Sequence, residues 1–201
     1  FATGMVGATI GRLGKSFAIQ ELAERKLETA LGKTSQALLE QASALQTQSS
    51  FGDEAIITQQ AFLASLSFSE NQISSMIPVA IDLAAALGIS LESAVKNLSK
   101  TYSGLQGELG ELVPQLKNLS VEQLKSGQAL RVITELMGGS AKEQVKTLDG
   151  SLRQMGMAFG DLAEQLGGVV APAIISVTKL LTTFITASNL KLFPNVKEEL
   201  E

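Results

Sequence analysis

Signals that start and stop helices recur along this chain, and they restrict its fold more than any other feature. Ser90 precedes an apolar segment that ends at Gly104, as an N-cap and a terminating glycine would. Residues 120–123 and 140–143 both have the Ser-x-x-Gln/Glu spacing of a capping box. No stretch alternates polar and apolar residues convincingly, and the run VVAPAIISV at 169–177 is the one strand alternative. These signals predict an all-α fold.

The stretch 73–104 predicts a hairpin of two helices. Gly88 stands where a left-handed cap would end the first helix, and Asp82 points away from its apolar face. Pro78 lies inside this helix and either kinks it or marks its first turn. The apolar faces comprise Ile73, Ile77, Ile81, Ala84 and Leu87, then Leu91, Ala94, Val95 and Leu98. The pattern describes a packing unit, with no titrating group in its crease.

Two further helices are predicted after this hairpin. The first starts at the box 120–123 and runs to Gly138 and Gly139. The second starts at the box 140–143, is interrupted by Gly150, Gly156 and Gly160, and ends at Gly167 and Gly168. Upstream, residues 50–66 predict a helix with Asp53 and Glu54 in its first turn, and Ser69 is a candidate cap for the helix that follows.

A sustained 4-3 spacing runs from Val6 to Leu45, in which eight of twelve positions are apolar. Such a repeat is typical of a coiled coil, and one continuous helix over 6–48 would measure about 60 Å. Leu27, Leu31, Leu38 and Leu45 are the predicted residues of a helix or oligomer seam. An ordinary amphipathic helix packed on the local bundle explains the same spacing, and Gly32 is a candidate break.

Both ends of the chain carry features typical of close helix contacts. The first 17 residues space four glycines along one helix face, including a GxxxG motif at Gly7 and Gly11, although a flexible lead-in explains them equally well. Residues 165–190 form an apolar run whose only charge is Lys179. Its threonines and Lys179 favour an oligomer seam over a membrane span, with Gly7, Gly11 and Lys179 as the candidate membrane contacts. The seam residues are Val170, Ile174, Val177, Leu181 and Phe184.

These features divide the chain into four regions. We expect a glycine-rich start and long coiled-coil-like helix over 1–50, a helical-hairpin core over 51–137, a helical region with an apolar last helix over 138–190, and an acidic tail over 191–201. The predicted fold is all-α, with hairpins and long amphipathic helices in an elongated arrangement around a symmetry axis. Because the first residue is Phe, we expect a processed product or a piece of something longer.

The composition limits the chemistry that the chain can perform. It has no His and no Cys, so a Ser-His-Asp or Cys-His nucleophile and a thiolate metal site are excluded within the chain. A net charge of −4 argues against a phosphate-binding surface, and no specific nucleic-acid binding is inferred. Carboxylates pair at 53/54, 108/111 and 198/199, but a helix start, an exposed turn and a tail explain them better than a glycosidase site does. We therefore predict no catalytic residue, no cofactor, no metal and no enzymatic activity.

Parts of the sequence resemble a known family. The run MIPVAIDLAAALGISLESAVKNL, with FGDEA upstream and LMGGSAKEQ downstream, is similar to the helical region of phage tail tape measure proteins, as is GDLAEQLGGVVAPAI at 160–174. The similar segments cover about residues 51–174, and their order and spacing carry the resemblance.

The resemblance implies a structural protein inside a long phage tail, which sets tail length and leaves the tail during DNA ejection. It also implies a location in the tail lumen or tip and later in the host envelope. The expected partners are copies of the chain, tail-tube and tail-tip proteins, and the host membrane on ejection. The alternative function is a membrane-active or pore-forming helical protein, and a cell-wall hydrolase is disfavoured by the missing His and Cys.

Overall fold

The computed structural model describes the backbone of residues 2–187 and the side chains of residues 17–168. Within those residues every regular element is a helix, so the all-α prediction is confirmed and the strand alternative at 169–177 is wrong. The chain divides into two units, one made of 1–17 with 161–201 and the other of 18–160. Each unit is described by itself.

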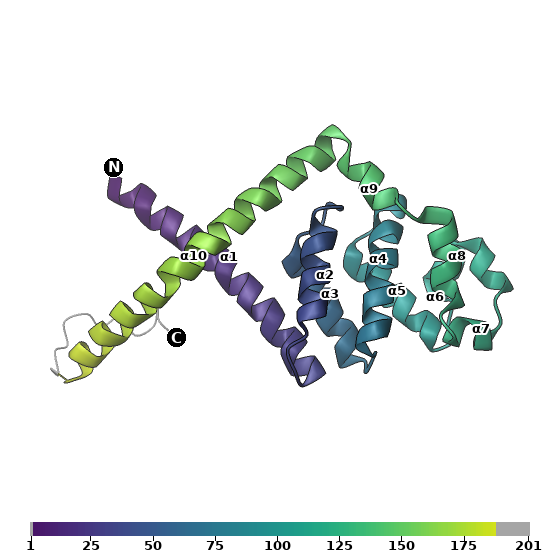
Figure 1. Cartoon of the computed structure of the whole chain (residues 1–201), viewed down its shortest axis with the longest axis horizontal. Helices are drawn as coiled ribbons and strands as arrows, with labels where there is room; N and C mark the ends of the chain where they lie inside the picture. Colours follow the sequence, from purple (N-terminus) through teal and green to yellow (C-terminus); the bar gives the residue numbers. More distant parts are fainter. Residues whose placement is uncertain (1, 188–201) are drawn as a thin grey trace. The chain divides into compact units, whose positions relative to one another are not determined.

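The helices are labelled in Figure 1. In chain order they are α1 (Ala2–Leu31), α2 (Gln36–Gln46), α3 (Asp53–Ser65), α4 (Glu70–Leu87), α5 (Leu91–Tyr102), α6 (Gly107–Leu112), the 3-10 helix η1 (Pro114–Asn118), α7 (Val121–Lys125), α8 (Gln128–Met137), α9 (Ser140–Val145) and α10 (Leu148–Ala187).

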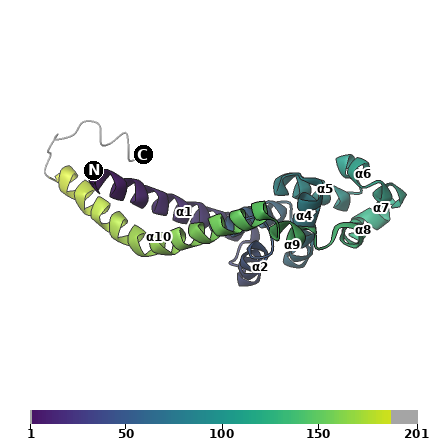
Figure 2. The same ribbon diagram turned by 90° about the horizontal axis from the view of Figure 1, so that it is seen from above.

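The predicted hairpin is present as α4 and α5, which pack against each other (Figures 1 and 2). Ser69 and Gln72 form a capping box at the start of α4, where each side chain bonds the backbone N–H of the other residue. Gly88 ends α4 in the left-handed conformation, with φ of 66°. Ser90 then caps α5 by accepting a hydrogen bond from the N–H of Ser93 at 3.1 Å. Local sequence signals therefore determine where α4 ends and where α5 begins.

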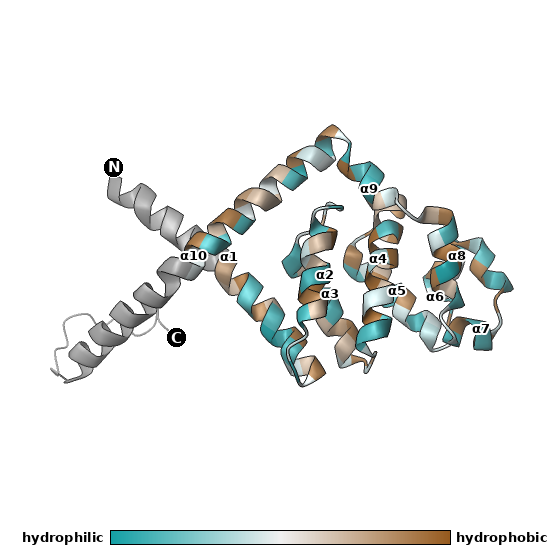
Figure 3. Ribbon diagram, in the orientation of Figure 1, coloured by the Kyte–Doolittle hydropathy of each residue, from teal (hydrophilic) through white to brown (hydrophobic). Residues whose placement is uncertain are grey.

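The core of the unit formed by 18–160 gathers around this hairpin. Side chains from α2, α3, α4 and α5 form its centre, with α9 packed against α4, α8 against α4 and α5, and α6 and α7 against α5. Apolar residues along α4 are coloured brown in Figure 3. The largest side chains with less than 2% exposure are Leu27, Leu38, Ile56, Ile57, Leu63, Ile73, Met76, Ile77, Leu83, Leu98, Leu109 and Leu116. The core therefore consists mostly of aliphatic side chains, as the low aromatic content of the chain requires.

Pro78 lies in the middle of α4, so the first-turn alternative is wrong. Because proline has no N–H, the carbonyl of Ser74, four residues earlier, loses its usual helical partner. The side chain of Gln41 on α2 replaces that donor: its Nε2 lies 2.8 Å from the Ser74 carbonyl and 2.9 Å from the Ser74 hydroxyl. A glutamine from a neighbouring helix thus completes the hydrogen bonding that the proline interrupts.

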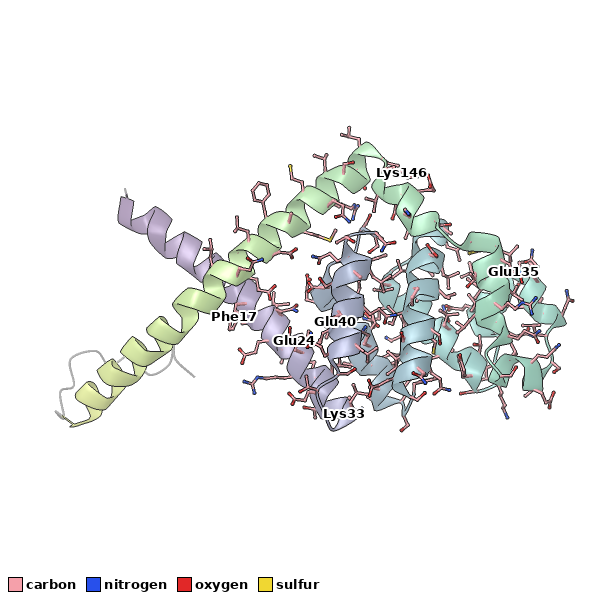
Figure 4. The ribbon with its side chains drawn as sticks, viewed as in Figure 1. Phe17, Glu24, Lys33, Glu40, Glu135 and Lys146 are labelled. Atoms are coloured by element: carbon pink, nitrogen blue, oxygen red, sulfur yellow. The ribbon has the colours of Figure 1, made fainter. Side chains whose placement is uncertain are left out.

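The continuous helix expected over 6–48 is interrupted. It ends at Leu31, because Gly32 adopts the left-handed conformation with φ of 71°, and α2 begins only at Gln36. The turn is tied to the start of α4, where the Glu70 carboxylate pairs with Lys33 and accepts a hydrogen bond from Ser35 at 2.6 Å. These two contacts hold the pKa of Glu70 below its ordinary value, and Figure 4 labels Lys33 at this turn. The chain thus folds back on itself.

Two other helix predictions need correction. The helix that starts at the confirmed box of Ser120 and Gln123 stops at Lys125, and α8 begins after Gly127, which is left-handed with φ of 82°. The region after Gly139 also differs. Its glycines at 150, 156, 160, 167 and 168 do not break or end a helix but lie within α10. Glycine lowers helix propensity without forbidding the conformation, so spacing alone could not decide between these outcomes.

Candidate functional site

The first predicted seam is divided between α1 and α2. Leu27 is 1% exposed and Leu38 is 2% exposed, and both belong to the core of the unit formed by 18–160. Leu31 and Leu45 are partly buried against the same core. The turn at Gly32 separates the two helices, and Leu27 and Leu38 are both buried in the core of their own chain. Whether a second copy also contacts this region stays a prediction.

The second predicted seam lies outside the described side chains. The backbone of α10 is helical over Val170, Ile174, Val177, Leu181 and Phe184, and over Lys179. Gly7 and Gly11 lie in α1, also within the helical backbone. The roles proposed for these residues stay predictions.

The carboxylate pairs are distributed as helix and turn residues. Asp53 and Glu54 occupy the first turn of α3, where negative charge is favoured by the helix dipole. In the next pair, Glu111 pairs with Lys117 at 2.8 Å, and Glu108 lies 3.5 Å from the Asn97 amide. The pair at 198 and 199 lies outside the described residues. Across the described part of the chain, no group of three or more His, Cys, Asp or Glu residues is placed to hold a metal ion.

Asp53 is the most perturbed of these carboxylates. Partial burial, followed by the charge of Glu54, raises the pKa of Asp53 above its ordinary value. Gln20 on α1 donates to Asp53 at 3.3 Å and to Glu24 at 2.8 Å, so one amide bridges acids from two helices. Figure 4 labels Glu24 on α1. The arrangement connects α1 to α3.

Asp82 has a role that the sequence did not predict. Its carboxylate accepts hydrogen bonds from the N–H groups of Gly139, at 2.9 Å, and Ala141, at 3.0 Å. Ser140 was expected to cap this helix, but its hydroxyl instead donates to the carbonyl of Met137. A side chain from α4 therefore caps α9, 57 residues further along the chain. Because Asp82 and the residues it caps are far apart in the sequence, local residue spacing could not predict this cap.

Buried amides form a second set of contacts that the sequence did not reveal. Gln60 is completely buried on α3 and donates to the carbonyl of Leu38 on α2 at 2.9 Å. Gln46, at the end of α2, accepts from the N–H of Asp53 at 2.6 Å. Gln154 on α10 donates to the carbonyl of Gln46 at 2.7 Å and also bonds the carbonyl of Ser49. These amides join α2 to its neighbours and attach the start of α10 to the same unit.

The most exposed apolar surface of the described side chains lies along α10. We define the α10 stripe as four residues at 4-3 spacing, each between 53% and 78% exposed: Leu148, Leu152, Met155 and Phe159. All four belong to the unit formed by 18–160. Side chains along the first half of this helix are drawn in Figure 4. Contiguous apolar surface of this kind marks an interaction site more often than scattered exposed leucines do.

Gly156, which flanks the α10 stripe, has open space beside it within the described part of the chain. A Cβ atom placed there has no neighbouring atom within 4 Å. A glycine in an exposed helix costs about 1 kcal/mol relative to alanine, so this position weakens α10 with no compensating contact inside the described chain.

Among the helices that the structure describes, none is both long and apolar enough to cross a membrane.

Comparison with models of known families, with curated proteins and with solved structures finds no match to this chain.

Proposed function

We propose that this chain is a structural segment of a phage tail tape measure protein. In this role it assembles with copies of itself and with tail-tube and tail-tip proteins in the tail lumen or tip. It contributes to tail length and leaves with the genome toward the host envelope. No enzymatic step is part of this role.

The resemblance over 51–174 is the observation that carries the proposal. The residues in that range form α3 to α9 and the first part of α10, so the resemblance covers a connected helical body and the helix that leaves it. The α10 stripe adds support, because an apolar helix face in water requires a cover and an assembly of identical copies supplies one.

The presence of this chain in phage tails, and the length of those tails, test the proposal. Particles from an induced culture of a cell that carries the gene should contain this chain when analysed by mass spectrometry. Internal deletions in the helical parts of the protein should shorten the tails, as measured by electron microscopy. A helix that lies along the tail axis contributes about 1.5 Å per residue, so removing the length of α10, which has 40 residues, predicts shortening by about 60 Å.

Two outcomes would contradict the proposal. The first is a set of tails that lack the protein, and the second is a tail length that does not change with the deletions. Binding to lipid vesicles by the purified chain, without incorporation into tails, would favour the membrane-active alternative. Hydrolysis of peptidoglycan that is lost on changing Asp53 or Glu108 to the corresponding amide would favour the hydrolase.

A further inference from the structure

We infer that the α10 stripe is a surface through which two or more copies of this chain pair helix to helix. The inference rests on the proposed assembly of copies and names the surface by which they meet. It adds a seam to those predicted at Leu27–Leu45 and at Val170–Phe184, because no residue of the α10 stripe belongs to either set.

The spacing of the α10 stripe is that of a coiled-coil seam. Its residues recur at intervals of four and three, which keeps them on one side of a helix and facing a parallel or antiparallel neighbour. Gln154 lies on a different face of the helix, and that face is the one bonded to the carbonyls of Gln46 and Ser49. The attachment through Gln154 therefore leaves the face with Leu152 and Met155 outward, where those side chains are 55% and 53% exposed.

The residues that flank the stripe point to an identical copy as the occupant. In a coiled coil the positions beside the seam carry the charges that choose the partner. Here these positions hold Ser151, Gly156 and Ala158, with Asp149 as the one charged residue. Asp149 is already paired with Arg153 of its own helix at 2.8 Å.

Two copies therefore meet along the stripe without repulsion between like charges, whereas a charged foreign partner finds no complementary group. Beside the stripe, Gly156 leaves room among the described residues for the backbone of a neighbouring helix to approach closely.

The test uses the full chain and measures its mass by light scattering over a wide range of concentration. The wild type should associate, and Phe159→Asp should raise the dissociation constant by about tenfold or more, because it places a charge in the seam. Lys142→Asp, at an exposed position on α9, is the matched control: it adds more negative charge away from the stripe and should change the constant less. Circular dichroism checks that each variant keeps its helices, which is expected since Phe159 is 65% exposed.

A second measurement locates the contact. Because the chain has no cysteine, Leu152→Cys introduces a single thiol into the stripe, and Arg153→Cys introduces one beside it. Association should slow alkylation at position 152 several-fold more than at position 153. A wild type that associates with no effect of Phe159→Asp and equal protection at both thiols overturns this surface and leaves the proposed function standing. A wild type that stays monomeric overturns the inference, whereas the presence of the protein in tails decides the proposed function separately.

Discussion

The α4–α5 hairpin and the α10 stripe share one sequence pattern and differ in what covers it. Both place apolar residues at helical spacing beside small side chains. In the hairpin, Ile77 and Leu98 are fully buried by neighbouring helices, whereas Phe159 on α10 is 65% exposed. Periodicity therefore predicts that a helix has an apolar face, but it does not say whether the cover for that face lies in the same chain. The difference separates the residues that stabilise one copy from those available to join copies.

Truncation of a core residue should have the largest effect. Ile77→Ala removes a fully buried side chain from the hairpin and should lower the free energy of unfolding by about 2–5 kcal/mol, since it leaves a cavity. The matched variant in the other region, Leu152→Ala, should change the stability of the monomer by about 0.5 kcal/mol or less. Denaturant unfolding at a concentration where the chain is monomeric measures both. Equal losses would mean that the α10 stripe is covered within the chain after all.

Removal of the cap that α4 supplies to α9 should have the next largest effect. Asp82→Ala leaves the N–H groups of Gly139 and Ala141 without their acceptor and should cost about 0.5–2 kcal/mol. Asp82→Asn keeps one acceptor oxygen and should cost less. Hydrogen exchange at Gly139 and Ala141 reports the loss directly. Unchanged exchange at both amides in Asp82→Ala would show that the cap does not hold α9 in solution.

A smaller effect with the opposite sign is expected on α10. Gly156→Ala should stabilise the helix by about 0.5–1 kcal/mol, because the added methyl group meets no atom of the chain and alanine favours the helix. Gly127→Ala is the control and should destabilise, because φ is 82° there and a Cβ atom would lie 2.7 Å from the Tyr102 hydroxyl oxygen. Thermal unfolding followed by circular dichroism measures the two changes. A loss of stability in Gly156→Ala would place a neighbour against α10 in the monomer.

The smallest effect concerns Asp53, which is only partly buried. Its pKa in the folded state is raised, so folding favours the protonated form and the cost of burying the charge is present at neutral pH. Asp53→Asn should therefore be more stable than the wild type at neutral pH. The difference should shrink as the pH falls through the raised pKa toward the ordinary value of about 3.9. Unfolding curves across this range test the sign, and a difference that does not depend on pH would contradict it.

Much of the fold could be predicted from local signals. Gly88 and Ser90 bond to groups within five residues, so their positions mark where α4 ends and α5 begins. The apolar spacing likewise identified the buried face of the hairpin, because a face of this kind must be covered. Gly32 was identified only as a candidate break, since a glycine tolerates both the helical and the left-handed conformation.

The remaining features depend on contacts between residues far apart in the chain. Asp82 and Gln41 lie on helix faces with nothing local to distinguish them from solvated side chains, and their partners are 57 and 33 residues away. The α10 stripe was missed for another reason. Its glycines at 150, 156 and 160 suggested interruptions, and a broken helix would have no common face on which Leu152 and Phe159 could align.

The amide of Gln41, which bonds the carbonyl left free by Pro78, has a mechanical consequence. One turn of a helix advances about 5.4 Å, so sliding one helix along another by one turn moves its side chains out of register with their partners. Such a slip would separate Gln41 from Ser74, and a comparable slip between α2 and α3 would separate Gln60 from Leu38. Each buried polar group left without a partner costs about 1–3 kcal/mol. The two glutamines therefore oppose the sliding of these helices along their axes.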